Sequence, residues 1–370
     1  MSTAAAAVEV AVEGLDVSVY EIPTDAPESD GTLEWESTTI VVVEAHAGGR
    51  TGLGYTYGPR AIASFVADQL ADVVAGSDAL KVRGSWARMQ SAIRNAGRQG
   101  VGAMAVSAVD NALWDLCARL LDLPLARLLG QVHERAHIYG SGGFCSYDEG
   151  QLKAQLGGWV EEGIPRVKMK VGREPARDRE RVRWAREAIG DEVELMVDAN
   201  GAYRPKEALA WASRFAERGI SWLEEPVSFD DVDGLAFVRR HGPPGLVMAA
   251  GEYGWSLFEF QRLLECAAVD CVQPDVTRCG GMTNVLRADG LCKVHCAPLS
   301  AHCAPALSVH VVCACETAVH IEYFHDHVRI ESMLFDGTLP PDGGSLEPDL
   351  SRPGNGLELK RADAARFAVA

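Results

Sequence analysis

The order of apolar and polar residues along the first 60 positions indicates a small β-sheet. The two kinds of residue alternate over residues 8–19 and again over residues 37–46, which is the period-two pattern of half-buried strands. Between these segments, residues 22–31 are rich in Pro, Asp and Glu and predict a long loop. A third, shorter strand is expected to end in residues 52–57.

Helical periodicity follows this sheet. Apolar residues recur three and four positions apart over residues 61–74 and most regularly over residues 101–121, where Trp114 belongs to the apolar stripe. Residues 1–128 are therefore expected to form a small α+β domain.

From residue 136 the pattern becomes a repeated unit of a short apolar strand, a break at Gly, Asp or Pro, and a helix, for example over residues 205–218 and 257–266. Eight such strands are predicted, at residues 137–139, 166–171, 193–198, 220–224, 246–251, 269–274, 297–301 and 318–323. Eight βα units over about 200 residues favour a closed (β/α)8 TIM barrel, placed at residues 129–340. An open doubly wound sheet is the alternative, but no glycine-rich nucleotide loop supports it.

The composition, with 47% apolar and 24% charged residues, is that of a globular protein. The N-terminus lacks the basic and apolar segments of a secretory signal, and no stretch approaches the about 20 apolar residues of a membrane span. The ten cysteines form no Cys-x-x-Cys pair, so we expect reduced, buried thiols in a cytoplasmic protein. The net charge of −17 argues against nucleic acid and anionic membranes as partners. An anionic substrate would need local positive charge to outweigh this field.

Acidic side chains stand where three neighbouring strands are predicted to end, which is where barrel enzymes carry their catalytic groups. Asp198, Glu224 and Glu252 are 26 and 28 positions apart, or one βα unit each. Three carboxylates at similar height predict a metal site, and their hard oxygens suit Mg²⁺, with Mn²⁺ as a possible substitute. The alternative is that these acids only cap helices or lie in solvent, which fits a single carboxylate better than three in register.

Lys168 and Lys170 lie two positions apart on one predicted strand, so both side chains are expected to face the barrel mouth. Two ammonium groups about 6 to 7 Å apart, with a divalent cation nearby, should lower each other's pKa toward neutrality. A neutral lysine is a competent base. The alternative is a pair of solvated lysines at a strand edge.

Further polar side chains stand at the remaining strand ends. Asp275 and His302 follow consecutive strands, so the carboxylate is placed to orient the imidazole as a second acid/base group; a structural histidine is the alternative. Glu322 follows the last strand and would donate a hydrogen bond to a substrate oxygen if its site raises its pKa. Asn200 shares the strand end of Asp198 and is a candidate contact to substrate.

Motifs around these residues resemble the mandelate racemase subgroup (mandelate racemase/muconate lactonizing enzyme-like) of the enolase superfamily, and the likeness spans nearly the whole chain. The motifs are residues 108–115, 168–170, 197–201, 222–226, 250–252, 273–275 with Gly280 and Gly281, 300–302 and 320–322.

The resemblance implies a modified (β/α)7β barrel covered by an α+β capping domain, which we expect the C-terminal tail, about residues 341–370, to complete. It implies Mg²⁺ ligation by Asp198, Glu224 and Glu252, base catalysis by Lys170, and a dyad of Asp275 with His302. It also implies that Lys168 contacts the substrate carboxylate. Adjacent strand residues face opposite ways, so only one of Glu224 and Glu225 can be a ligand, and the family pattern picks Glu224.

The implied chemistry is removal of the α-proton of a small carboxylate substrate to give an enediolate, with charge stabilised by Mg²⁺, Lys168 and Glu322. If His302 then protonates a departing hydroxyl, the product is a 2-keto-3-deoxy acid, and we predict this dehydration of a sugar acid. If His302 instead reprotonates the opposite face, the enzyme is a racemase or epimerase. A cycloisomerase is a further alternative. A remote alternative is a non-catalytic barrel that serves as a binding or structural protein.

Substrate specificity is expected from loops of the cap, at residues 22–34 and 55–57. Tyr57 falls where the family places a cap residue that touches substrate, although packing between the domains is an equal alternative. His325, Asp326, His327 and Arg329 follow Glu322 and would either line the pocket or form a solvated loop. A homo-oligomer is expected from the resemblance alone.

Overall fold

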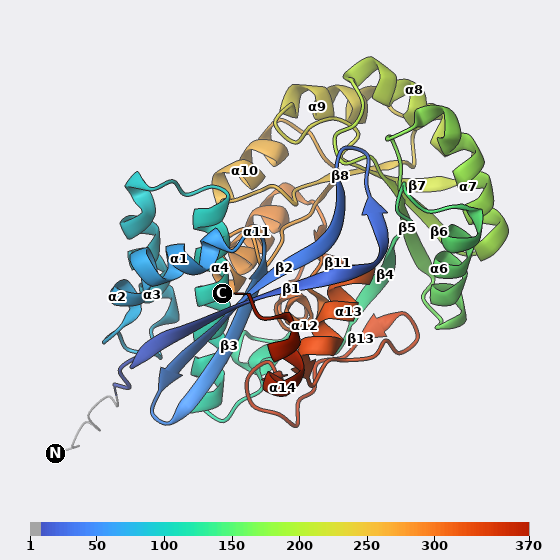
Figure 1. Cartoon of the computed structure of the whole chain (residues 1–370). Helices are drawn as coiled ribbons and strands as arrows, with labels where there is room; N and C mark the ends of the chain where they lie inside the picture. The colour runs from blue at the N-terminus through green and yellow to red at the C-terminus, as the bar shows by residue number, and fades with distance from the viewer. Residues whose placement is uncertain (1–8, 370) are drawn as a thin grey trace.

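The computed structural model describes residues 9–369, which form a barrel covered on one side by a smaller α+β cap (Figure 1). The cap begins with an antiparallel sheet in the order β1 (Gly14–Ser29), β2 (Glu34–Ala47) and β3 (Arg50–Tyr57). Alternate residues of β2 face opposite ways, as the sequence predicted. Val41 and Val43 join the core of the cap, whereas Ile40 and Val42 belong to the core shared with the barrel.

The helix α4 (Val101–Leu120) packs closely against β3. Gly52 and Gly54 permit this contact, because a Cβ at either position would lie 2.3 Å from a backbone oxygen of α4. The other helical segments of the cap are α1 (Ala61–Phe65), a π-helical turn (Val66–Leu70), α2 (Ala71–Val74), α3 (Val82–Ala92), a 3₁₀ turn (Ile93–Asn95) and α5 (Leu125–Leu128).

The long loop predicted over residues 22–31 is wrong, because β1 continues to Ser29 and turns into β2 within four residues. Pro23 and Pro27 suggest a loop, but β1 is the edge strand of its sheet, where a missing N–H costs no ladder hydrogen bond. The register shifts between Pro23 and Glu28. The result is a long hairpin that reaches toward the barrel (Figure 1).

The barrel contains all eight predicted strands, in parallel, and closes between β11 and β4. The strands are β4 (Ala136–Gly142), β5 (Arg166–Lys170), β6 (Glu194–Asp198), β7 (Ile220–Glu224), β8 (Val247–Ala250), β9 (Cys271–Val272), β10 (Leu299–Ala301) and β11 (Ala318–Phe324). A short strand, β13 (Ser345–Leu346), pairs antiparallel with β4. The fold is therefore a TIM barrel of the (β/α)7β type with an N-terminal capping domain.

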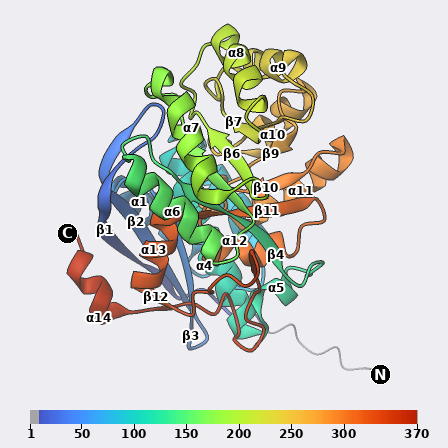
Figure 2. The same ribbon diagram turned by 90° about the vertical axis from the view of Figure 1, so that its right-hand side faces the viewer.

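Helices connect successive strands and surround the barrel (Figure 2). They are α6 (Glu149–Glu161), α7 (Pro175–Ile189), α8 (Pro205–Ala216), α9 (Val232–His241), α10 (Leu257–Glu265), α11 (Met282–His295) and α12 (Pro305–Val312), with α13 (His325–Leu334) after β11. Inside the barrel, an apolar layer of Tyr139, Met196, Trp222, Ala249 and Cys271 supports the strand ends.

The C-terminal segment returns to the cap. It contains β12 (Phe335–Asp336), which pairs with β14 (Glu358–Leu359), then α14 (Arg361–Ala364) and a 3₁₀ turn (Ala365–Phe367). The N–H of Val369 donates to the carbonyl of Val19 in β1. The division of the chain at residues 128 and 340 stays a prediction.

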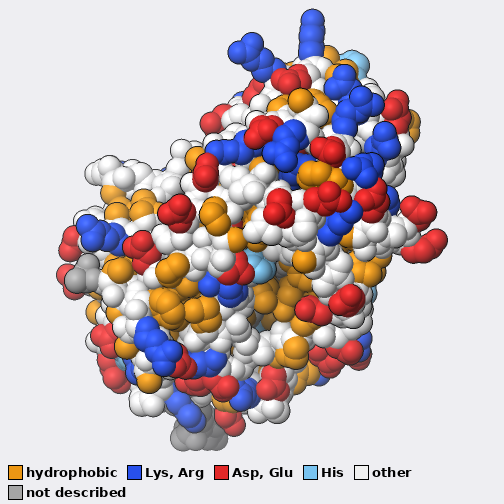
Figure 3. Space-filling view, turned by 45° about the vertical axis from the view of Figure 1, so that its right-hand side comes forward, with side chains coloured by type: hydrophobic (Ala, Val, Ile, Leu, Met, Phe, Trp, Pro, Cys, Tyr) orange, Lys and Arg blue, Asp and Glu red, His pale blue; other side chains and the backbone are white. Residues whose placement is uncertain are grey.

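The surface and the thiols agree with the sequence analysis. On the face shown in Figure 3, Lys and Arg side chains lie among Asp and Glu rather than in one basic surface. All ten cysteines are free, and seven of them are buried. Among residues 9–369, no helix is both long and apolar enough to cross a membrane.

Candidate active site

Three buried carboxylates meet at the barrel mouth. Asp198 and Glu224 are the last residues of β6 and β7 and are direct register partners, and Glu252 follows β8 by two residues. One oxygen from each lies within 4.8 Å of the others, and the side chains are at most 5% exposed. Buried like charges are unfavourable unless a cation lies between them, so this oxygen set fits a divalent metal ion.

The surroundings of Glu224 support this fit. Its Oε2 accepts hydrogen bonds from Lys168 Nζ (2.6 Å), Gln273 Nε2 (2.9 Å) and Trp222 Nε1 (3.2 Å). Its Oε1 is buried and has no hydrogen-bond partner among the described residues. Burial, and then the charge of Asp198, raises the pKa of Glu224 to about 7. One oxygen is thus held in place while the other is left for a ligand.

The two lysines of β5 both contact these carboxylates, but at different depths. Lys170 Nζ lies 2.6 Å from Asp198 Oδ2. Lys168 is fully buried, with Nζ 2.6 Å from Glu224 Oε2 and 2.8 Å from Glu322 Oε1. Lys170 lines the cavity described below and Lys168 does not.

In the chain without a metal ion, the pKa values of both lysines lie above their usual values, so lowered values stay a prediction for the metal-bound site. Burial lowers the pKa of Lys168, but the charges of Glu224 and Glu322 outweigh it and hold that pKa well above its usual value. Burial likewise lowers the pKa of Lys170, and the charge of Asp198 outweighs it. The sequence argument counted the like charge of the two lysines and a nearby divalent cation, whereas in the chain by itself the surrounding carboxylates have the larger effect.

Asp275 and His302 form the predicted pair. His302 follows β10, and its Nδ1 lies 2.7 Å from Asp275 Oδ2. Its Nε2 lies 2.8 Å from Glu252 Oε2. Burial lowers the pKa of His302, but its acidic neighbours raise it more, so the imidazolium form is favoured. Asp275 also accepts from the backbone and hydroxyl of Thr277, which fixes its orientation.

Glu322 is an acceptor rather than the proton donor that the sequence suggested. Burial alone would raise its pKa, but the ammonium group of Lys168 holds the pKa of this carboxyl well below its usual value. The hydroxyl group of Ser141 donates a hydrogen bond to Glu322 Oε1. The ionised form is therefore the stable one.

A cavity of about 270 Å³ opens between the barrel mouth and the cap. From the barrel it is lined by Lys170, Asn200, Glu252, Tyr253, Arg278, His302, Cys303, Glu322, Phe324 and His327. From the cap it is lined by Asp30, Leu33, Trp35, Ser37, Thr38, Thr39, Tyr57 and Gly58. The base and acid candidates, Lys170 and His302, come from β5 and the end of β10 and face one space.

Five substrate contacts were predicted: three of them line this cavity, namely Asn200, Tyr57 and Glu322, and two do not, namely Lys168 and His325. Asn200 lines it, and Tyr57 stacks on the imidazole of His327 with ring centroids 3.5 Å apart. His325 lies outside the cavity lining, and its Nε2 is 2.9 Å from Asp25 Oδ2 in the hairpin. Of the residues after Glu322, His327 reaches the cavity, whereas Asp326 and Arg329 pair with each other.

Sequence reasoning missed four residues around the site: Trp35, Gln273, Arg278 and Cys303. Cys303 lies in the site, with its Sγ 3.2 Å from His302 Nε2. Because it directly follows His302 at a predicted strand end, the sequence could have indicated it as a site residue. Arg278 lies one turn beyond Asp275, with its Nε 3.4 Å from Asp275 Oδ2.

Glu225 was excluded by strand alternation, but β7 ends at Glu224 and Glu225 has a φ of 36°. Alternation therefore does not govern its direction. Burial, then the charge of Glu252, holds its pKa well above the usual range. It stands outside the group of three oxygens within 4.8 Å.

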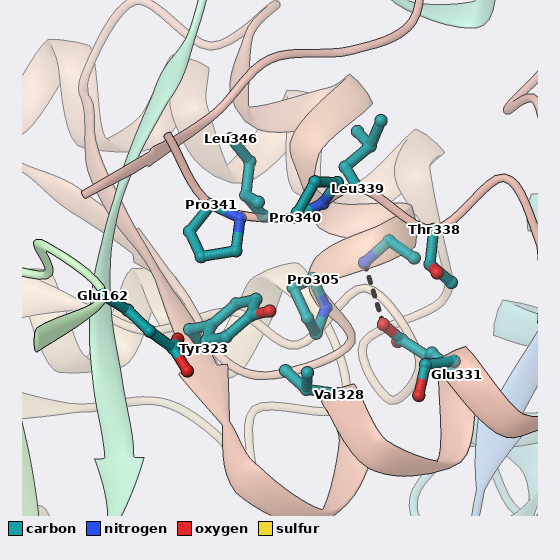
Figure 4. A pocket seen from close by; sticks show the side chains of 12 residues that line it. Glu162, Pro305, Tyr323, Val328, Glu331, Thr338, Leu339, Pro340, Pro341 and Leu346 are labelled. Atoms are coloured by element: carbon teal, nitrogen blue, oxygen red, sulfur yellow. Dashed lines mark hydrogen bonds between the residues drawn. The ribbon is translucent and has the colours of Figure 1, made fainter. Parts of the chain in front are cut away.

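A second cavity, of about 500 Å³, lies outside the barrel between Pro305, α13 and the C-terminal segment (Figure 4). Prolines and leucines line it, and Glu331 is buried beside it. Glu331 accepts hydrogen bonds from the hydroxyl of Tyr55 (2.6 Å) and the N–H of Ala306 (3.1 Å). These bonds tie cap to barrel, and the acid/base groups of the first cavity do not line this one.

Comparison with known proteins agrees with the geometry. Residues 16–130 match the mandelate racemase/muconate lactonizing enzyme N-terminal domain, and residues 151–364 match the enolase C-terminal domain-like family. The crystal structure of a mandelate racemase/muconate lactonizing enzyme-like protein from Rubrobacter xylanophilus superposes with a TM-score of 0.95 at 63% identity, covering 97% of this chain and 100% of that one.

Two characterised relatives are more distant. The 3,6-anhydro-α-L-galactonate cycloisomerase of Streptomyces coelicolor is 31% identical over 368 residues, 97% of this chain and 99% of that protein. The L-talarate/galactarate dehydratase of Salmonella typhimurium is 30% identical over 325 residues, 85% of this chain and 81% of that protein. Its structure with Mg and L-lyxarohydroxamate has a TM-score of 0.89 at 28% identity and covers 100% of this chain and 96% of that one. The chain therefore belongs to the enolase superfamily, in the mandelate racemase subgroup.

Proposed function

We propose that this protein is a Mg²⁺-dependent dehydratase that converts a sugar acid into a 2-keto-3-deoxy acid. The observation that carries the proposal is the placement of Lys170 and His302 around one cavity beside three buried carboxylates. The Salmonella dehydratase, whose structure contains Mg and a sugar-acid analogue, supports the metal and the substrate class.

Asp198, Glu224 and Glu252 would hold the ion. When bound, Mg²⁺ would supply positive charge against these carboxylates and against the charge that develops on the substrate carboxylate. Lys168, buried between Glu224 and Glu322, fixes these two acids and adds a second positive charge beneath the site.

Lys170 is proposed to remove the α-proton in its neutral form, which Mg²⁺ bound to Asp198 would favour by offsetting the carboxylate charge that raises the lysine pKa. His302 is proposed to give a proton to the departing hydroxyl on the next carbon, so that its imidazolium form, favoured by its acidic neighbours, is the reactive one. Asp275 fixes the tautomer by holding Nδ1. Asn200, Tyr57 and Glu322 are the proposed polar contacts to substrate; His325 is left out because it pairs with Asp25.

The main alternative is cycloisomerisation, because the Streptomyces relative that spans 97% of this chain is a cycloisomerase. The same base would act first. An oxygen atom that stays attached to the substrate would then leave the next carbon in place of water, so that no water is lost. Racemisation or epimerisation is the third outcome of the same proton removal. A cytoplasmic location and a homo-oligomer stay predictions.

One experiment separates these reactions. The protein is incubated with Mg²⁺, D₂O and a panel of sugar acids, and the products are followed by NMR and mass spectrometry. A dehydratase forms a 2-keto acid with loss of water, and the Lys170→Met and His302→Asn variants lose this product. Solvent deuterium in an otherwise unchanged acid, or a product that has not lost water, whether or not it is a 2-keto acid, would contradict dehydration.

A further inference from the structure

The charges around the cavity are distributed unevenly between its barrel side and its cap side. All the basic side chains that line it come from the barrel, namely Lys170, Arg278, His302 and His327. Among the described residues that line it, the eight from the cap include no Lys, Arg or His. The two ends of a bound substrate would therefore meet different surroundings.

The cations on the barrel side already face acidic partners near the metal ligands. Lys170 Nζ lies 2.6 Å from Asp198 Oδ2, and Arg278 Nε lies 3.4 Å from Asp275 Oδ2. Burial lowers the pKa of His327 to about 3, so this ring is neutral at physiological pH. The basic side chains of the cavity wall thus all lie on the barrel side, beside the proposed metal ligands, where one substrate carboxylate would be held.

The cap side carries one charge, and it is negative. Asp30 is 6% exposed, and its Oδ1 accepts the N–H groups of Thr32 and Leu33 at 2.6 Å each. The nearby arginines are occupied outside the cavity: Arg173 pairs with Glu34 and Arg329 with Asp326, each at 2.6 Å. A second carboxylate on the substrate would meet Asp30 without a cation to balance it.

The rest of the cap side suits an uncharged chain with hydroxyl and carbon faces. Ser37, Thr38 and Thr39 are polar and neutral. Beside these residues, Trp35 of the cap and Phe324 of the barrel each pack edge-on against Phe144, with ring centroids 5.7 Å apart, so their rings form one aromatic wall. Aromatic rings favour contact with the C–H groups or a methyl group of a ligand.

Resting on the proposed function, we infer that the substrate is a monocarboxylic sugar acid, such as an aldonate or a 6-deoxy aldonate, and not an aldarate with a second terminal carboxylate. Its single carboxylate lies at the barrel side, and its uncharged end lies against the cap, beside Leu33, Trp35 and Phe324.

The test compares matched acids on the Lys170→Met holoenzyme with Mg²⁺, so that binding is measured without turnover. Isothermal titration is carried out with galactonate and galactarate, with gluconate and glucarate, and with the 6-deoxy acids L-rhamnonate and L-fuconate. We expect at least one monoacid to bind about tenfold or more tighter than every aldarate. An aldarate that binds as tightly as the best monoacid would overturn the inference and leave the proposed function standing. Failure of every acid to bind, together with no deuterium exchange by the wild type, would overturn both.

A charge-introducing pair tests the electrostatic cause. Leu33 lines the cavity at its rim and is 61% exposed, so it tolerates polar substitution. Leu33→Lys adds a positive charge on a long, unbranched side chain, and Leu33→Met, with an unbranched side chain and no charge, is the control. Galactarate should bind about tenfold tighter to Leu33→Lys than to Leu33→Met, while galactonate changes little. Equal galactarate affinity in the two variants would contradict the assignment of the cap as the anion-excluding side.

Discussion

The side-chain amide of Gln273 donates a hydrogen bond of 2.9 Å to Oε2 of Glu224. Both side chains are buried, and the same oxygen also accepts from Lys168. Gln273 does not line the cavity, so its effect passes through Glu224, whose other oxygen remains free for the metal. It is a positioning residue.

Gln273→Leu is expected to weaken Mg²⁺ or Mn²⁺ binding about 10- to 100-fold, because groups that orient a metal ligand contribute this much to metal affinity. Isothermal titration with the metal alone measures the effect. Gln261→Leu, on an exposed face of α10, is the matched control and should bind metal like the wild type. Unchanged affinity in Gln273→Leu would show that Lys168 and Trp222 suffice to hold Glu224.

The barrel and its three carboxylates were predictable because both follow the βα repeat. Once Asp198, Glu224 and Glu252 are placed at strand ends, their meeting needs only the parallel order of neighbouring strands. Gln273 was not predictable in this way, since its role depends on which side of β9 it faces and on the rotamer of Glu224.

The expectations that differ from the structure share one cause, because they were made from neighbours in sequence where neighbours in space decide. Lys168 and Lys170 were judged from each other, yet their charge is set by carboxylates from β6, β7 and β11. Pro23 indicated a loop, yet the edge position of β1 accommodates it. His325 was judged from its place after Glu322, yet the hairpin brings Asp25 to it.

Removal of one metal ligand should abolish stabilisation by Mg²⁺. At a Mg²⁺ concentration 100 times its Kd, binding adds about 2.7 kcal/mol to the free energy of unfolding of the wild type. Asp198→Asn should lose most of this increment, measured as the difference in Tm with Mg²⁺ and with EDTA. Asp191→Asn, at an exposed position, is the control and should keep it. An equal Mg²⁺ effect in Asp198→Asn and wild type would place the metal elsewhere.

Glu331, which links the cap to the barrel, should make the free energy of unfolding depend on pH. Burial raises its pKa from 4.5 to about 8, so the folded state holds a proton that the unfolded state has released. The stabilisation that this proton gives to the folded state is complete below pH 4.5 and is lost as the pH rises through 8. The free energy of unfolding falls over this range by no more than about 1.4 kcal/mol per pH unit.

Glu331→Gln keeps the shape of the protonated acid and does not titrate. Denaturant unfolding from pH 5 to pH 8.5 should therefore show wild-type stability falling relative to that of Glu331→Gln. Parallel pH profiles for the two proteins would mean that Glu331 has an ordinary pKa in the folded state.

Gly31, at the tip of the hairpin between β1 and β2, should be essential for seating the hairpin on the barrel. A Cβ at this position would lie 2.2 Å from the carbonyl oxygen of Ala199 and 2.8 Å from that of Val171, both backbone atoms of barrel loops. Gly31→Ala must therefore lift the tip, together with Asp30 and Leu33 of the cavity wall. We expect faster hydrogen exchange over residues 24–34 and a kcat/KM about 10- to 100-fold lower on any accepted acid.

Gly14→Ala is the matched control, since Gly14 lies at the far end of β1 from the hairpin tip and its Cβ would meet no atom within 4 Å. It should leave exchange at the hairpin tip and kcat/KM unchanged. Because the backbone oxygens below Gly31 cannot move without displacing the ends of β5 and β6, relaxation has to occur in the hairpin. Wild-type exchange over residues 24–34 in Gly31→Ala would show instead that the barrel loops yield, and that the hairpin is not held by this contact.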